Sequence, residues 1–194
     1  MPATRPLVAL AAAILATAVM NGAAAGTQTA SNTPKQEFTA NAVNMSNVGN
    51  PGASQVEITV NAYTTDAARD RLMEVFRKDG EAALLRALQN ERSVGSIRAP
   101  GSLAYDLRYA RELPGEEGGR RLILATDRPI GFAEARNNPR TLDYPFTLIE
   151  LRLDGEGRGE GRLSIATKLT LNDNVLVIEN YADQPVMLKD VRRR

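Results

Sequence analysis

The fold is decided by one continuous stretch, Leu103-Ala-Tyr-Asp-Leu-Arg-Tyr-Ala-Arg-Glu112, Leu113-Pro-Gly-Glu-Glu-Gly-Gly119 and Arg120-Arg-Leu-Ile-Leu-Ala-Thr-Asp127. In its first segment Leu and Tyr alternate with Ala, Asp and Arg, and a period of two is typical of a half-buried strand. The middle segment is rich in Gly and contains a Pro, which is typical of a turn. The stretch therefore predicts an antiparallel hairpin, with arms at 103–112 and 120–127, at the centre of a sheet.

Further strands are predicted on both sides of this hairpin, because similar apolar runs lie between turn residues. Two shorter candidates lie at 37–45 and 93–98. The segment 155–161 is a glycine-rich repeat between two strands, which predicts a mobile hairpin loop. The clearest remaining strands are 55–63, 146–154, 162–171, 175–179 and 185–191.

Two short helices are predicted at 66–78 and 81–90, because apolar residues recur there at i, i+3 and i+4. Gly80 separates them, and glycine is common just past a helix end. Short connections favour antiparallel neighbours. We therefore expect an α+β fold with an antiparallel, meander-like sheet of about seven strands and two short helices packed on one face.

The N-terminus predicts export. Arg5 is the only charged residue before Lys35, and an apolar run of about 14 residues follows it and ends near an Ala-Ala-Ala sequence at 23–25. This pattern is typical of a cleaved secretory signal, and the run is shorter than the roughly 20 residues of a membrane anchor. We expect a signal peptide at 1–25, a flexible mature N-terminus at 26–36 and a single α+β domain at 37–194. The mature protein would be periplasmic or secreted.

The composition excludes several chemistries. The chain has no histidine and no cysteine, so it cannot use Ser-His-Asp or Cys-His catalysis, disulfides or most zinc and haem sites. Carboxylate chemistry and oxygen-only cation sites remain open. We predict no catalytic residue, no metal site and no cofactor. Because the formal net charge is only +1, we also predict no nucleic-acid partner. We predict no membrane span after removal of the signal.

The first candidate site lies on the first arm of the hairpin. Asp106 and Arg108 are two residues apart, so they share one face of a strand, and Tyr105 lies beside them. One interpretation is an ion pair on the solvated side of a sheet, which contributes little to stability. The other is a polar pocket wall for an anionic or hydroxylated ligand.

Two further candidate clusters follow the hairpin. Asp127 and Arg128 lie where the second arm ends, with Arg136 nearby. One interpretation is that they shape the turn before Pro129; the other is that they line a binding cleft, because loops at strand ends often carry binding sites. Asp143 and Tyr144 precede Pro145, which favours an extended or turn geometry. One interpretation of Tyr144 is a packed, hydrogen-bonded core residue; the other is a part of the binding site. The spacing of the acidic residues singles out no carboxylate pair for hydrolysis.

Five segments of the chain carry a family resemblance. They are Phe38-Thr-Ala-Asn-Ala-Val-Asn-Met45, Tyr105-Asp-Leu-Arg-Tyr-Ala-Arg111, Ile123-Leu-Ala-Thr-Asp-Arg-Pro-Ile130, Asp143-Tyr-Pro-Phe-Thr-Leu-Ile-Glu-Leu-Arg-Leu153 and Glu179-Asn-Tyr-Ala182. Together they resemble a family of exported bacterial proteins of unknown function. The resemblance implies export and carries over no activity, cofactor or catalytic residue.

The leading functional hypothesis is an exported, non-enzymatic domain that binds an unknown small ligand or a protein partner of the cell envelope. One alternative is a carboxylate-dependent periplasmic hydrolase. Another is an envelope assembly protein that uses the edge of a sheet to bind its partner.

Overall fold

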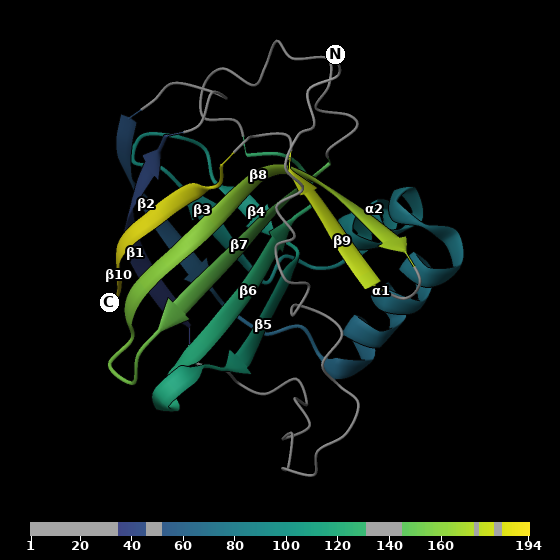
Figure 1. The fold of residues 1–194 in the computed structure, drawn as a ribbon, viewed down its shortest axis with the longest axis horizontal. Helices are drawn as coiled ribbons and strands as arrows, with labels where there is room; N and C mark the ends of the chain where they lie inside the picture. Colours follow the sequence, from purple (N-terminus) through teal and green to yellow (C-terminus); the bar gives the residue numbers. More distant parts are fainter. Residues whose placement is uncertain (1–34, 46–51, 131–144, 173–174, 181–183) are drawn as a thin grey trace, which may run out of the picture.

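The computed structural model describes residues 35–45, 52–130, 145–172, 175–180 and 184–194, and the predicted signal peptide lies outside these ranges. The described chain forms ten antiparallel strands, two α-helices and one 3₁₀ turn (Figure 1). The helices are α1 (Asp66–Asp79) and α2 (Glu81–Asn90), and the 3₁₀ turn is η1 (Glu116–Gly118). The strands are β1 (Gln36–Asn44), β2 (Gly52–Val60), β3 (Gly95–Arg98), β4 (Tyr105–Leu107), β5 (Tyr109–Pro114), β6 (Arg120–Thr126), β7 (Phe146–Leu153), β8 (Arg158–Asn172), β9 (Val175–Asn180) and β10 (Val186–Arg193).

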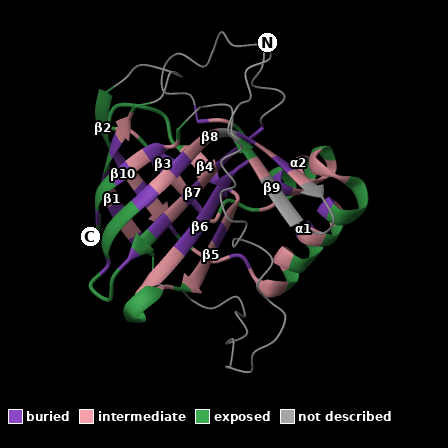
Figure 2. Cartoon of the chain, in the orientation of Figure 1, coloured by how far each residue is buried: buried purple, intermediate pink, exposed green. Residues whose placement is uncertain are grey.

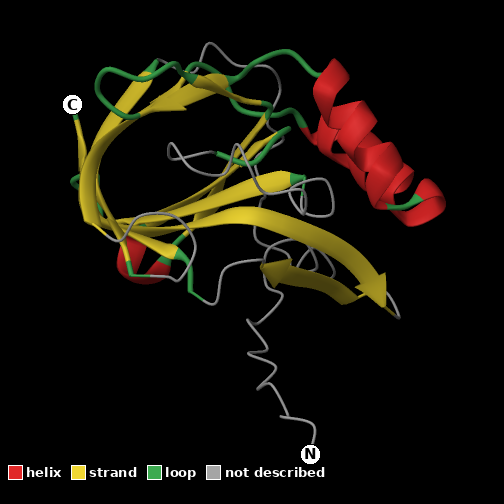
Figure 3. Ribbon diagram, turned by 90° about the horizontal axis from the view of Figure 1, so that it is seen from above, coloured by secondary structure: helices red, strands yellow, loops and turns green. Residues whose placement is uncertain are grey.

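The strands form a nearly closed barrel. Their order in the sheet is β4-β3-β2-β1-β10-β8-β7-β6-β5, and β9 pairs with β8 off this path. The two end strands, β4 and β5, are consecutive in the chain and separated by Arg108 alone, so the sheet curls until its ends meet (Figure 3). The predicted open, meander-like sheet of about seven strands is therefore wrong.

The predicted first arm, 103–112, is not one strand. Leu107 and Ala110 are both 0% exposed in the barrel core, although an unbroken period of two would place them on opposite faces. The break at Arg108 turns the chain between them, so that β4 pairs with β3 while β5 pairs with β6. Leu103, predicted to share the face of Leu107, is 88% exposed. The antiparallel hairpin of β5 and β6 is confirmed, but it lies at one end of the sheet and not at its centre.

Apolar side chains fill the inside of the barrel. Figure 2 shows buried residues along its strands. They come from alternate positions of the strands, as expected where one face of each strand is buried. The barrel interior is therefore a packed core. Its buried members are Phe38, Ala40, Ala42, Val56, Ile58, Val60, Ile97, Leu107, Ala110, Leu122, Leu124, Ile130, Ile149, Leu151, Leu153, Leu163, Val186, Leu188 and Val191.

The segment after β2 covers the line where the barrel closes, which we call the seam. The amide of Thr64 donates to the carbonyl of Ala110 at 2.7 Å, and the Thr64 hydroxyl accepts from the Ala110 amide at 3.0 Å. Thr64 is only 6% exposed, so both groups are satisfied without water. The amide of Val94 donates to the carbonyl of Leu107 at 2.8 Å on the other side of the seam. Short local segments thus bind the edges that the sheet itself leaves open.

The two helices have nearly the predicted bounds. The Thr65 side chain caps α1 by accepting from the Ala68 amide at 3.2 Å, and Gly80, with φ 77°, separates α1 from α2. The helices pack on the outside of the barrel at one side (Figure 3), so the prediction of helices on one face of an open sheet is wrong. Their contact forms a second apolar cluster, whose buried members are Leu72, Phe76, Leu88, Phe146 and Leu169. Among the described residues, no helix has the length and apolar composition needed to cross a membrane.

The glycine-rich segment predicted as a mobile loop is mostly strand. The turn between β7 and β8 is short, and the Asp154 carboxylate fixes it by accepting from the amides of Glu156 and Arg158, both at 2.9 Å. Gly159 already lies in β8, where a Cβ atom would sit 1.8 Å from the carbonyl oxygen of Arg152. Glycine is required there because two backbones approach closely.

Candidate functional site

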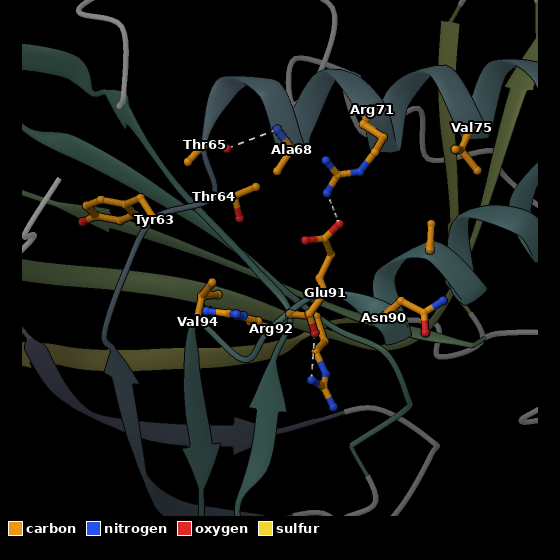
Figure 4. A pocket seen from close by; sticks show the side chains of 12 residues that line it. Tyr63, Thr64, Thr65, Ala68, Arg71, Val75, Asn90, Glu91, Arg92 and Val94 are labelled. Atoms are coloured by element: carbon orange, nitrogen blue, oxygen red, sulfur yellow. Dashed lines mark hydrogen bonds and ion pairs between the residues drawn. The ribbon is translucent and has the colours of Figure 1, made fainter. Parts of the chain in front are cut away.

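A cavity of about 560 Å³ lies outside the barrel, beside the seam (Figure 4). Its walls are one side of α1, the end of α2 and the segments that flank the seam. Its volume is within the range of small-molecule sites in proteins. The lining side chains are Tyr63, Thr64, Thr65, Ala68, Arg71, Val75, Ala87, Asn90, Glu91, Arg92, Val94 and Arg108.

Arg108 is the predicted site residue that reaches this cavity. Its Nη2 atom lies 3.3 Å from the Asp106 carboxylate, and its Nη1 donates to the carbonyl oxygen of Glu91 at 2.9 Å. Its Nε lies 3.4 Å from the Asp127 carboxylate, an ion pair without hydrogen-bond geometry. Arg108 therefore joins β4, the end of α2 and the exit of β6.

Asp127 is held between two arginines. Its side chain is 5% exposed, and its second oxygen lies 3.3 Å from Nε of Arg128. Asp106 is more open, and it also accepts from the Ser93 hydroxyl at 3.1 Å. The half-buried Tyr105 packs against the barrel core. Four of the predicted residues, counting Arg108 itself, thus converge at the seam in one ion-pair network, and Tyr105 packs against the core.

Apart from Arg108, the predicted site residues that the structure describes lie away from the cavity wall. Tyr105, Asp106, Asp127 and Arg128 do not line the cavity. The other three predicted residues, Arg136, Asp143 and Tyr144, lie outside the described residues.

Sequence reasoning missed the helical half of the cavity wall. Arg71 lies on α1, while Glu91 and Arg92 follow directly after α2. The sequence does contain a run of polar residues at the end of the predicted helix 81–90, and this run could have pointed to the cavity wall. Such a run, however, usually marks only the end of a helix.

The charges in the cavity are unevenly paired. Arg71 and Glu91 point toward one another across the cavity, with Nη2 of Arg71 2.5 Å from the Glu91 carboxylate (Figure 4). The exposed Arg92 has no ion-pair partner among the residues that the structure describes. The positive charge of Arg108 is balanced by its ion pairs with the carboxylates of Asp106 and Asp127. The cavity therefore carries one uncompensated positive charge.

Tyr63 connects the cavity wall to a buried polar network. Its hydroxyl donates to the Glu112 carboxylate at 2.6 Å and accepts from Nε2 of Gln36 at 2.9 Å. Arg120 lies 3.1 Å from the same carboxylate. Burial raises the pKa of Tyr63, and its hydrogen bond to the negative Glu112 raises it further. The Gln36 Oε1 atom is buried without a hydrogen-bond partner. This network fixes the Tyr63 ring in the wall.

The cavity offers limited chemistry. Within the described ranges, Glu91 is the one carboxylate that lines it, and Arg71 neutralises this group. A hydrolase with paired carboxylates needs two acids at a fixed separation. Among the described residues no group of three or more acidic side chains is placed to hold a metal ion. The arrangement offers mixed apolar and polar walls that can contact a bound molecule.

A scan against protein-family models found no match, and searches of curated proteins and of solved structures also found no similar protein.

Proposed function

We propose that this protein is a non-enzymatic binding protein that holds a small ligand in the cavity beside the seam. The observation that carries the proposal is a cavity of about 560 Å³ with mixed apolar and polar walls, next to a barrel whose interior is filled by its own side chains. Ligand sites are typically concave, largely apolar and equipped with a few convergent polar groups.

The fixed geometry of the walls supports the same proposal. Thr65 begins α1, Arg108 ties the end of α2 to the seam, and Glu112 locks Tyr63. A preformed site lowers the entropy that is lost on binding.

The test is a thermal unfolding screen of the purified mature protein with sugars, fatty acids, amino acids and aromatic acids. A ligand that binds only the folded state raises the Tm. We expect Ala68→Trp, which places a large ring in the cavity, to abolish that rise. Ala67→Trp, on the exposed side of the same helix, should retain it. If a ligand still raises the Tm of Ala68→Trp, or if no class of ligand raises the Tm of the wild type, the proposal is contradicted.

We also propose that the protein acts after export, in the periplasm or outside the cell. The apolar run that follows Arg5 and the Ala-rich exit at 23–25 support this. Expression of the full chain in a bacterium, followed by cell fractionation and intact mass measurement, tests it. We expect a periplasmic or secreted product that begins at Gly26, whereas an uncleaved cytoplasmic product would contradict export.

The two alternative functions stay predictions. The hydrolase has less support because the cavity presents one carboxylate, already paired with Arg71. For assembly through a sheet edge, the relevant strand is β9, which pairs with β8 alone among the described strands.

A further inference from the structure

The three arginines that line the cavity differ in what already binds them. Arg108 contacts the carboxylates of Asp106 and Asp127 and the carbonyl of Glu91, so its guanidinium group is occupied by the protein. Its side chain is only 19% exposed. Arg108 is therefore a structural residue that holds the cavity wall in place, and it is a poor candidate to receive a ligand.

Among the residues that the structure describes, Arg71 has one ion-pair partner, the Glu91 carboxylate at 2.5 Å. Its side chain remains 58% exposed. A carboxylate that reaches into a cavity from the opposite wall occupies the position that the acid group of a ligand would take (Figure 4). Glu91 thus competes with an anionic ligand for Arg71.

Arg92 is the arginine without a competitor. It is exposed, lines the cavity and has no ion-pair partner among the described residues. The same cavity presents apolar surface from Ala68, Val75 and Val94. A ligand that matches both features has an apolar body and one negative group. Guanidinium groups bind carboxylates, sulfonates and phosphates through charge-assisted hydrogen bonds.

We propose that the cavity selects an organic anion with an apolar body, and that Arg92 is the residue that recognises its negative group. This inference rests on the proposed binding function and adds the chemical class of the ligand. Glu91 lowers the affinity for such an anion, because its carboxylate holds Arg71.

The experiment compares two fluorescent probes that differ by one charge. Anilinonaphthalene sulfonate carries a sulfonate, and phenylnaphthylamine is the same skeleton without it. We expect the sulfonate to bind the wild-type protein about tenfold more tightly, the effect of one charge-assisted hydrogen bond. Arg92→Gln should remove this preference and leave the neutral probe unchanged, while Glu91→Gln should strengthen binding of the sulfonate.

The matched control is Arg86→Gln, which removes the same charge from an exposed position of α2 outside the cavity. It should behave as the wild type, and far-UV circular dichroism verifies that each variant is folded. Equal affinity for the two probes in the wild type, or equal effects of Arg92→Gln and Arg86→Gln, would overturn the inference.

The two proposals fail in different ways. If Ala68→Trp abolishes binding of both probes and the wild type binds them equally, the cavity binds ligands but does not select anions. If both probes bind Ala68→Trp as well as the wild type, they bind outside the cavity and both proposals are wrong.

Discussion

The backbone amide of Arg108, the residue between the end strands β4 and β5, donates a 2.9 Å hydrogen bond to the carbonyl of Ala125 in β6. The side chain of the same residue lines the cavity and donates to the carbonyl oxygen of Glu91 at 2.9 Å. Arg108 therefore contributes both to the seam and to the cavity wall.

Thr64→Val should destabilise the protein at the seam. The substitution keeps the shape of the side chain but leaves the buried Ala110 amide without its acceptor at 3.0 Å. An unsatisfied buried donor costs about 1–3 kcal/mol of unfolding free energy. Urea denaturation measures the loss, with Thr59→Val on the outward face of β2 as the control. Similar losses in the two variants would show that the seam hydrogen bond contributes little.

Gly159→Ala should be among the most destabilising small substitutions in the chain. The new Cβ atom would lie 1.8 Å from the Arg152 carbonyl oxygen, so β7 and β8 would have to separate locally. We expect a loss of about 3 kcal/mol, the upper end of the usual cost of overpacking. Gly155→Ala is the control, because nothing lies within 4 Å of its added Cβ. A Gly159→Ala protein as stable as this control would contradict the strand assignment.

The ion pair between Arg108 and Asp127 should have a large coupling energy although its atoms are 3.4 Å apart. Asp127 is 5% exposed, and Arg108→Met would leave its charge buried beside Arg128 alone, at a cost of about 2–3 kcal/mol. A double-mutant cycle with Asp127→Asn should give a coupling energy of about 1 kcal/mol or more.

The exposed pair of Arg98 and Glu57, at 2.6 Å, provides the comparison for this cycle. Its coupling should be smaller, because solvent screens exposed pairs. Equal coupling energies for the two pairs would show that the ion pair at the seam stabilises the protein no more than an exposed ion pair does.

Tyr63→Phe should change how stability depends on pH. At neutral pH it removes the hydrogen bonds of the hydroxyl with Glu112 and Gln36, at a cost of about 1–3 kcal/mol. Because the folded-state pKa of Tyr63 is raised, its contribution is complete below about pH 10, the unfolded value, and is lost as the pH rises further. The stability gap between wild type and Tyr63→Phe should therefore narrow above about pH 10. Guanidinium denaturation across this range measures it, and a gap that stays constant would contradict the raised pKa.

The sequence predicted the features that local signals determine. Both helices have bounds close to the expected ones, because the Thr65 cap and Gly80 are marks that act within a few residues. The hairpin of β5 and β6 was predictable for the same reason. The break at Arg108 was not, because Leu107 and Tyr109 continue the alternating pattern as an unbroken strand would.

The barrel and the cavity could not be predicted because both are long-range. Closure requires β4 and β5, neighbours in the chain, to lie at opposite ends of the sheet, and no local pattern encodes this. Arg71 looks like an ordinary solvated helix residue, and Arg92 looks like an ordinary residue of the segment that follows a helix. They become a cavity wall only because Arg108 holds the end of α2 against the seam. Of the predicted site residues, Arg108 was the informative one, although its role is to position the wall.

The most direct test of the central claim, that this protein binds a ligand beside the seam, is a titration of the ¹⁵N-labelled mature protein with anilinonaphthalene sulfonate followed by amide chemical shifts. We expect saturable shifts concentrated at the lining residues of α1 and α2 and on Arg92 and Val94, with the interior strands unchanged. Shifts concentrated on another surface, or no saturable shift, would contradict the account.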